Sequence, residues 1–180
     1  GILMTWSWIL DSAPNNVANY YLLRLGVIDK AIGWFDTPSL AWMWIIIVTV
    51  WWLCGFGVLL YLGALERIPP EQYESAKIDG AGPWASFWHV TLPWIRNVLL
   101  FDVARNVILA FGLFDQVLIL TAGGPGGATR TLVYYLYLTG FQRQQFGRAA
   151  AVAWYIFVVT ALFGVVQLLL LGKSVKAVEE

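Results

Sequence analysis

The sequence predicts an all-α fold: a polytopic helical bundle in a membrane, with at least three spanning helices. Hydrophobic residues make up 59% of the 180 residues and charged residues only 12%, where about 25% is usual in a soluble domain. Two long stretches of the chain contain no charged residue, and each is longer than the roughly 20 apolar residues that cross a bilayer. A disordered chain is therefore excluded.

The counts of charged and metal-binding residues exclude further classes. Basic and acidic residues balance at 11 each, which leaves no net positive charge for nucleic-acid phosphate. One Cys cannot form an internal disulfide. Cys54 and His89 are the only soft metal ligands and lie far apart in the sequence, so we expect no metal site.

The N-terminal part combines an apolar stub with a loop. Residues 1–10 are apolar, too short to cross a bilayer, and lack the Met start and basic flank of a signal peptide. We expect them to be the end of an upstream transmembrane helix, in the C-terminal part of a longer protein; a natural start at Gly1 is the alternative. Residues 11–41 have the Asp, Asn, Gly and Pro content of a loop with a short helix.

Two gaps in the charge pattern predict the plainest spans. Nothing is charged between Asp36 and Glu66, or between Arg148 and Lys173. A charged side chain at the bilayer centre costs several kcal/mol, so each gap predicts a transmembrane helix. The predicted helices are residues 42–65 and 149–172, and residues 173–180 form a tail.

A third apolar stretch, residues 94–121, is interrupted by polar side chains. At 100° per residue many of them fall on one face of a helix. Its length and its position between two plain spans favour a third transmembrane helix whose polar face meets protein or water; a soluble amphipathic helix is the alternative. The face contains Asp102, Arg105, Asn106, Leu109, Leu113 and Gln116, and Asp115 is a further charge in the stretch.

Residues 66–93, between the first two spans, predict a helix, a turn and a second helix. Pro70 suits a first helical turn, Gly80 and Gly82 break the helix, and a second short helix over 84–90 ends at Pro93. The loops on the two sides of the predicted bundle carry five basic residues each. The positive-inside rule therefore does not orient the bundle.

The same loop matches a known spacing: Glu-Ala-Ala, three residues, Gly, nine residues, Ile, one residue and Leu-Pro. It resembles the cytoplasmic signature of permease subunits of binding-protein-dependent ABC importers, with Ser in place of one Ala and Val in place of Ile. The matching residues are Glu74-Ser75-Ala76, Gly80, Val90 and Leu92-Pro93. Ile68-Pro69, residues 78–82 and residues 121–125 add a resemblance to the sugar, maltose-type branch.

The resemblance implies the type I importer permease fold and an orientation. Residues 66–93 would be a cytoplasmic loop that docks on an ATPase subunit, residues 122–148 an external loop like residues 11–41, and the tail cytoplasmic. The ATPase-coupling residues implied are Tyr73, Glu74, Ser75, Ala76, Lys77, Asp79, Gly80 and Ala81.

The resemblance also implies partners and a location. We expect a second permease subunit, homologous or identical, two ATPase subunits, an extracytoplasmic solute-binding protein and a sugar substrate, in a bacterial or archaeal plasma membrane. The chain itself would be no enzyme and would hold no cofactor, because ATP and Mg would bind to the ATPase subunit. The Gly-rich segment 123–127 lacks the Gly-Lys-Ser/Thr of a phosphate-binding loop.

Candidate substrate-pathway residues lie on the first and second spans, because intramembrane polar groups and aromatic faces suit a sugar. The alternative is helix packing, with Asp102 paired to Arg105 at i,i+3. The pathway candidates are Thr49, Trp52, Leu53, Asn106, Leu109, Ala110 and Leu113.

Together these features predict an ATP-driven importer of a sugar or related polyol that works by alternating access and is coupled through residues 71–90. Two alternatives remain at this point. One is a permease of the same superfamily for another solute, such as a glycerol phosphate or an oligopeptide. The other is a membrane scaffold without transport activity.

Overall fold

The computed structural model describes residues 1–176 and is helical wherever it is regular. No β-strand occurs in that part of the chain, so the all-α prediction is confirmed. The chain forms two compact units. Unit 1 comprises residues 1–52 and 111–158, and unit 2 comprises residues 53–110 and the chain from residue 159 onward.

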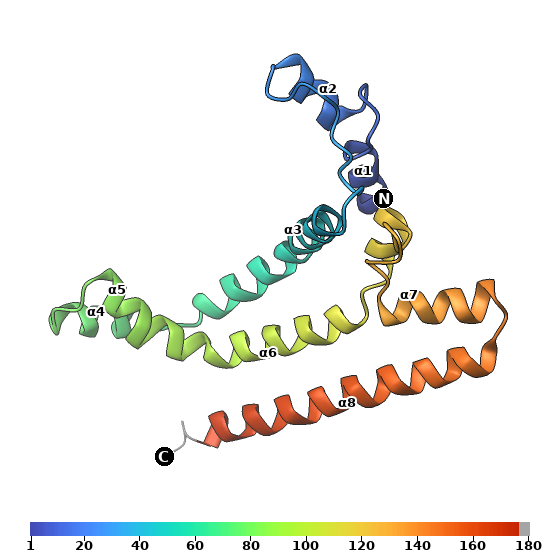
Figure 1. The fold of residues 1–180 in the computed structure, drawn as a ribbon. Helices are drawn as coiled ribbons and strands as arrows, with labels where there is room; N and C mark the ends of the chain where they lie inside the picture. The colour runs from blue at the N-terminus through green and yellow to red at the C-terminus, as the bar shows by residue number, and fades with distance from the viewer. Residues whose placement is uncertain (177–180) are drawn as a thin grey trace. The chain divides into compact units, whose positions relative to one another are not determined.

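Unit 1 is organised around a small apolar core. Its buried members are Ile45, Val48, Val117, Leu120 and Tyr134. The elements of this unit, labelled in Figure 1, are α1 (Ile2–Ile9), α2 (Val17–Arg24), the first half of α3 (Pro38–Leu65), the π-helices η2 (Val117–Thr121) and η3 (Leu138–Gln142), α7 (Leu132–Tyr137) and the first half of α8 (Phe146–Lys176).

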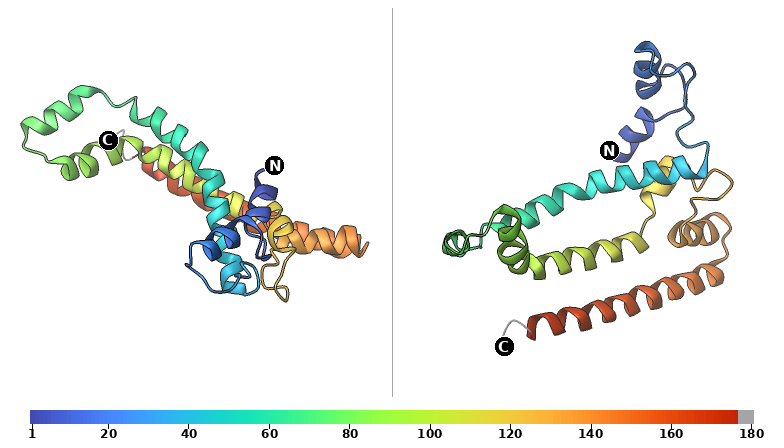
Figure 2. Two further views of the ribbon diagram at one scale, coloured as in Figure 1. Left: turned by 90° about the horizontal axis from the view of Figure 1, so that it is seen from above. Right: turned by 60° about the vertical axis from the view of Figure 1, so that its left-hand side comes forward.

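Unit 2 is a helical hairpin with two short helices at its closed end. The second half of α3 and α6 run antiparallel, and α4 and α5 lie where they are joined (Figure 2). A small core of Ile68, Val90 and Ile95 fills that end. The short elements are α4 (Pro70–Ile78), α5 (Pro83–Ser86) and the π-helix η1 (Phe87–Thr91), and α6 spans Leu92–Phe111.

Two helices are long and apolar enough to cross a membrane: Pro38–Leu65 and Phe146–Gln167, searched over the described residues. Both coincide with the gaps in the charge pattern. Only 11% and 6% of their most apolar windows are buried inside the chain, so these helices present apolar side chains to lipid or to other subunits. Residues 177–180 of the predicted tail lie outside the described residues, and residues 173–176 continue α8.

The helix predicted over 94–121 is interrupted. α6 ends at Phe111, three non-helical residues follow, and the chain becomes helical again before η2. The Thr131 hydroxyl donates a 2.7 Å hydrogen bond to the Leu113 carbonyl, which in a continuous helix would accept from residue 117. The polar face predicted from 102 to 116 is therefore split between two elements. With Arg96, Asp102 and Arg105, α6 is not among the two span candidates.

Pro93 does not end a helix, contrary to the prediction. The chain is helical from Pro83 through Phe111, with the π-helix η1 immediately before α6. The Leu92 N–H donates to the Phe87 carbonyl, five residues back. Since proline donates no hydrogen bond and crowds the carbonyl four residues earlier, the wider π turn accommodates Pro93 without a break.

Candidate functional site

The first candidate site is the predicted coupling segment, residues 71–81, which comprises α4 after its first residue and the turn that follows it. α4 begins with Pro70 at its first position, and Glu71 lies in the first turn. Proline supplies the φ that a first turn needs, and a carboxylate there interacts favourably with the helix dipole. The basic Lys77 lies in the last turn, where the dipole favours positive charge.

The turn after α4 is a Schellman motif. The Gly80 N–H donates to the Lys77 carbonyl at 3.0 Å, and the Ala81 N–H donates to the Ala76 carbonyl at 2.9 Å. Gly80 has φ +79°, the left-handed conformation that this motif requires and that glycine adopts without strain. A Cβ at Gly80 would meet no atom within 4 Å, so the bend rather than crowding within the chain explains this glycine.

One face of α4 packs against the rest of unit 2. Tyr73 and Ala76 pack against the core of Ile68, Val90 and Ile95. The Tyr73 hydroxyl lies 3.0 Å from the Thr91 hydroxyl, within hydrogen-bonding distance. These contacts fix the orientation of α4 relative to η1.

The opposite face is open. Of the predicted coupling residues, Glu74, Ser75, Lys77, Asp79 and Gly80 are exposed, whereas Tyr73, Ala76 and Ala81 are half-buried. Two large apolar side chains that the prediction did not include, Ile78 (86% exposed) and Trp84 (76% exposed), are also open to solvent. Such apolar exposure beside charges is typical of an interaction surface.

The second candidate site is a polar cluster that joins α3 and α6 within unit 2. The Tyr61 hydroxyl donates to Asp102 Oδ2 at 3.1 Å, and Arg105 Nη1 lies 3.6 Å from Asp102 Oδ1. The Arg105 guanidinium carbon lies 4.0 Å from the centre of the Phe56 ring, a cation–π contact. Asp102 is 7% exposed. The positive charge of Arg105 therefore compensates the buried carboxylate, and Tyr61 supplies a hydrogen bond to Oδ2, whereas Oδ1 has no hydrogen-bond partner within the described residues.

The expected pairing of Asp102 with Arg105 is present, and Asn106 accepts a 3.3 Å hydrogen bond from Arg105. Tyr61 was missed by sequence reasoning, because only the packing of α3 on α6 brings it to Asp102. No local pattern distinguishes Tyr61 from the other aromatic residues of this span.

The remaining pathway candidates are divided between the units. In unit 1, Trp52 is 47% exposed, and the Thr49 hydroxyl donates to the Ile45 carbonyl at 2.6 Å. Leu113 packs against the core of unit 1. In unit 2, Leu109 is 44% exposed, Ala110 is exposed, and Leu53 and Asn106 are half-buried.

Comparison with known proteins decides the family. The model of the family described as "binding-protein-dependent transport system inner membrane component" matches residues 1–176. The chain belongs to this family. Membership confirms the resemblance to importer permeases and the multi-pass inner-membrane location. It also confirms the expectation of a non-catalytic subunit without a cofactor, because in this family ATP is bound by the partner ATPase.

Several relatives of this inner membrane component are named as permeases for saccharides, and others only as probable ABC transporter permeases. The lactose transport system permease protein LacF of Rhizobium radiobacter is 36% identical, over 92% of this chain and 55% of the relative. The trehalose/maltose transport system permease protein MalF of Thermococcus litoralis is 37% identical, over 91% of this chain and 54% of the relative. The chain spans about half the length of the curated relatives it matches.

A solved structure shows the same fold. A chain of a bacterial alginate ABC transporter, crystallised with an alginate pentasaccharide-bound periplasmic protein, superposes with a TM-score of 0.81 at 23% identity, over 92% of this chain and 57% of that chain. The importer permease fold predicted from the loop signature is therefore confirmed.

Proposed function

We propose that the chain is the permease part of an ATP-driven importer that moves a sugar or related polyol inward by alternating access. The coupling segment would dock on a separate ATPase subunit at the cytoplasmic face, and residues 11–41 and 122–148 would face outward. A second permease subunit would complete the pathway, and an extracytoplasmic binding protein would deliver the solute. The sugar class is supported by the relatives named for lactose and for trehalose and maltose.

The observation that carries the coupling role is the division of α4 into two faces. Tyr73 and Ala76 pack α4 against the rest of unit 2. The exposed side chains of Glu74 and Lys77 make no hydrogen bond or ion pair within the described residues. A helix held from one side transmits a push on its other side to η1 and α6, because η1 continues directly into α6. Docking of an ATPase subunit would thus act on a candidate pathway helix.

The polar cluster indicates which part of α6 would line the solute pathway. Asn106 lies one residue from Arg105 on α6, and Leu109 and Ala110 lie one helical turn further along. We propose that these side chains meet the solute and that the Asp102 cluster holds α6 against α3 while they do so. Polar groups at membrane depth are functional candidates by default.

The decisive experiment measures assembly and transport with the full-length permease and its partner subunits. Glu74→Lys and Gly80→Trp each alter the exposed side of the coupling segment, so both should abolish co-purification of the ATPase subunit and ATP-dependent uptake. Glu66→Lys is the matched control: Glu66 is also exposed but precedes α4, so assembly should be retained. Unchanged assembly and uptake in both coupling variants would contradict the proposal.

The solute class needs its own comparison. Uptake into proteoliposomes is measured for lactose, maltose, trehalose, glycerol 3-phosphate and an oligopeptide. We expect ATP-dependent accumulation of at least one sugar. Accumulation of only the phosphate or the peptide would reject the sugar class and retain the coupling mechanism, whereas an assembled complex that accumulates nothing would favour a scaffold.

A further inference from the structure

The loop of residues 122–148 carries positive charge and no negative charge. It contains three arginines, and no acidic residue occurs between Asp115 and Glu179. Residues 11–41, by contrast, contain three Asp and two basic residues. The positive-inside rule favours basic residues on the cytoplasmic side, so three arginines oppose it in a short loop that faces outward in the proposed orientation. A role outside the membrane would explain them.

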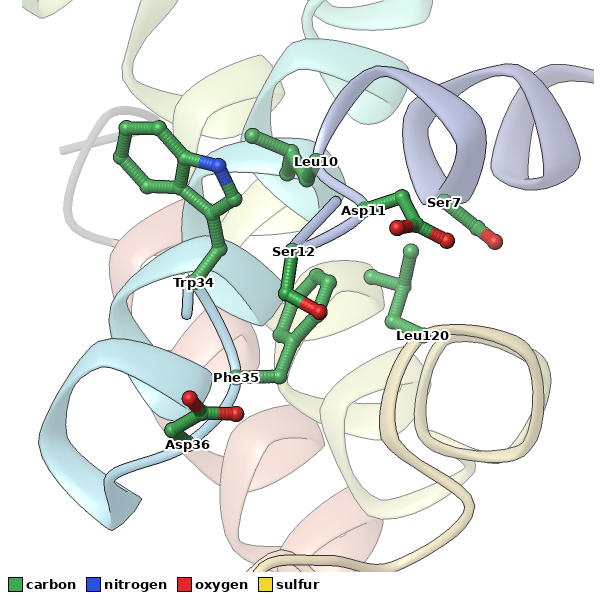
Figure 3. A pocket seen from close by; sticks show the side chains of 8 residues that line it. All are labelled: Ser7, Leu10, Asp11, Ser12, Trp34, Phe35, Asp36 and Leu120. Atoms are coloured by element: carbon green, nitrogen blue, oxygen red, sulfur yellow. The ribbon is translucent and has the colours of Figure 1, made fainter. Parts of the chain in front are cut away.

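The acidic loop does not neutralise these arginines. Figure 3 shows Asp11 and Asp36 on a small polar pocket between the end of α1 and the loop before α3, and no arginine lines that pocket. The Arg143 side chain makes no hydrogen bond or ion pair within the described residues. Arg148 donates to the neutral side chain of Gln145 at 3.2 Å. Within residues 1–176, no carboxylate therefore pairs with either arginine.

The turn between η3 and α8 holds these two arginines. We call residues 141–148 the basic turn. The Arg143 N–H donates to the Leu138 carbonyl at 3.0 Å, and the Gln145 N–H donates to the Thr139 carbonyl at 2.9 Å. Both bonds close the basic turn onto η3, so its backbone presents the side chains in fixed directions.

Gln144, at the centre of the basic turn, has an unfavourable backbone conformation. Its φ of +54° lies in the left-handed region, which is disfavoured for any residue with a Cβ and which glycine adopts readily. The Gln144 side chain is exposed and makes no hydrogen bond within the described part of the chain. Strain of this kind is concentrated at functional sites. We therefore expect the amide of Gln144 to serve an external contact.

The exposed side chains of the basic turn have the composition of a protein-binding surface. Phe141 is 69% exposed and Phe146 is 66% exposed, and Arg143 and Gln144 lie between them in the sequence. Aromatic residues and arginine are enriched in protein–protein interfaces. Arginine also binds carboxylates through two parallel hydrogen bonds. An acidic protein surface therefore fits this turn.

The family supplies a candidate for that acidic partner. It is described as dependent on a binding protein, which would approach the permease from outside. Lipid headgroups are the alternative, because the basic turn lies at the start of the span candidate α8. A fluid bilayer surface needs no strained and fixed turn, and attraction to anionic lipid is typical of the cytoplasmic leaflet. Both arguments favour the binding protein.

We propose that the basic turn docks on an acidic patch of the extracytoplasmic solute-binding protein. Arg143 and Arg148 pair with carboxylates of that patch, and Gln144 adds a hydrogen bond. This inference rests on the proposed function for the outward orientation of the loop and for the partner. It adds which surface of the chain is used and that opposite charges guide the encounter.

The test uses the full-length permease, assembled with its partner subunits in nanodiscs of phosphatidylcholine. The association rate constant of the sugar-loaded binding protein is measured at low and at high salt. Arg143→Glu should lower it about tenfold at low salt, and the difference should shrink at high salt because salt screens exposed charges. A rate equal to the parent's at both salt concentrations would overturn the proposal. So would an unchanged rate with loss of co-purifying anionic lipid, which would assign the turn to headgroups.

Arg24→Glu is the matched control for charge. Arg24 is an exposed arginine of the other external loop, and its guanidinium donates to the Tyr20 hydroxyl at 2.9 Å. The substitution makes the same change of charge outside the basic turn, so it should alter the association rate less than about twofold. Equal slowing by Arg24→Glu and Arg143→Glu would mean that net charge guides the binding protein, which would overturn the proposal.

Gln144→Gly separates docking from folding. The variant removes the amide and relieves the backbone strain, so its Tm should not fall. The binding protein should nevertheless dissociate about threefold faster, because one hydrogen bond of the interface is lost. A lower Tm with unchanged dissociation would mean that Gln144 serves the fold, and would overturn its part in the proposal.

Chemical cross-linking tests the contact directly. A carbodiimide joins a lysine amine to a carboxylate, and Arg143→Lys keeps the positive charge while supplying the amine. Mass spectrometry should then find position 143 linked to an Asp or Glu of the binding protein. Arg24→Lys should give no such link. Absence of the link at position 143, or equal linking at both positions, would overturn the proposal.

Import assays separate this inference from the proposed function. Sugar import with an unchanged association rate in Arg143→Glu would overturn the role of the basic turn and retain the importer. Slowed association in Arg143→Glu, in a complex that imports no sugar, would retain the basic turn and reject the sugar class. A complex that neither binds a binding protein nor imports a solute would overturn both.

Discussion

Two turns of the molecule, one after α4 and one after η2, place glycine at positive φ for different reasons. Gly80 has φ +79° and Gly123 has φ +77°. A Cβ at Gly80 would meet nothing within 4 Å, whereas a Cβ at Gly123 would lie 2.6 Å from the Tyr134 ring. The turn after η2 is also tied by the Tyr134 hydroxyl, which donates to the Ala122 carbonyl at 2.9 Å, and by Thr129, whose hydroxyl donates to Gly124 at 2.7 Å.

The conformation of the first turn is fixed by local backbone hydrogen bonds, and that of the second by side chains more distant in the sequence. The Gly80 turn is defined by the hydrogen bonds of its own helix end, so its outer surface is left open, as the proposed docking on an ATPase subunit requires. The Gly123 turn is defined by Tyr134 of α7 and by Thr129 of the loop between η2 and α7, and the Tyr134 ring fills the space beside Gly123. Substitutions should therefore damage stability at the second turn and assembly at the first.

The largest expected effect is at Gly123. Gly123→Ala combines a positive φ with overlap on Tyr134, so we expect a loss of about 3 kcal/mol in stability, measured by thermal unfolding of the purified transporter. Gly126→Ala is the control, because Gly126 has φ +60° but open space around its Cα; its loss should be about 1 kcal/mol. Equal losses would mean that packing on Tyr134 does not define the turn.

Asn19→Ala should come next. It removes the buried amide that bonds the Ile32 N–H and the carbonyls of Ser12 and Ile32, which should cost about 2 kcal/mol and expose residues 11–37 to limited proteolysis. Asn15 is exposed, and its side chain makes no hydrogen bond within residues 1–176, so Asn15→Ala should leave the proteolytic pattern unchanged. An Asn19 variant as resistant as the parent would show that the loop is held by other contacts.

Tyr73→Phe should cost about 1 kcal/mol, because it removes the hydrogen bond to Thr91 from a half-buried site. Its readout is a double-mutant cycle with Thr91→Val in thermal unfolding. The two losses should not add if the hydroxyls bond to each other. Tyr21→Phe, at an exposed tyrosine, serves as the neutral reference.

The smallest effect should be at Gly80. Asn adopts the left-handed conformation more readily than Ala, so Gly80→Asn should lose a few tenths of a kcal/mol and Gly80→Ala about 1 kcal/mol. Thermal unfolding ranks the two variants. The reverse order would mean that the backbone conformation at Gly80 is not what requires glycine.

Local signals in the sequence predicted much of the fold. The span candidates α3 and α8 coincide with the gaps in charge because the penalty for a charge in lipid acts residue by residue. The turn at Gly80 was predicted because a Schellman motif depends on one glycine at a helix end.

Long-range packing accounts for what the sequence did not predict. α6 ends at Phe111 while Thr131, 18 residues beyond Leu113, bonds to the Leu113 carbonyl, and no window of sequence contains that pairing. The same holds for Tyr61 beside Asp102 and for the loop between α1 and α3, where Asn19 joins Ser12 to Ile32. Asn19 was a loop residue in the sequence, and its role appears only when its three backbone partners are in place.

The exposed apolar side chains of Ile78 and Trp84 have a consequence for the life of the protein in a cell. A subunit made in excess over its partners would present these side chains uncovered, and uncovered apolar surface is what chaperones and proteases recognise. Assembly would hide them and remove the signal for degradation. The steady-state amount of the chain should therefore follow the supply of its partner subunit rather than its own rate of synthesis.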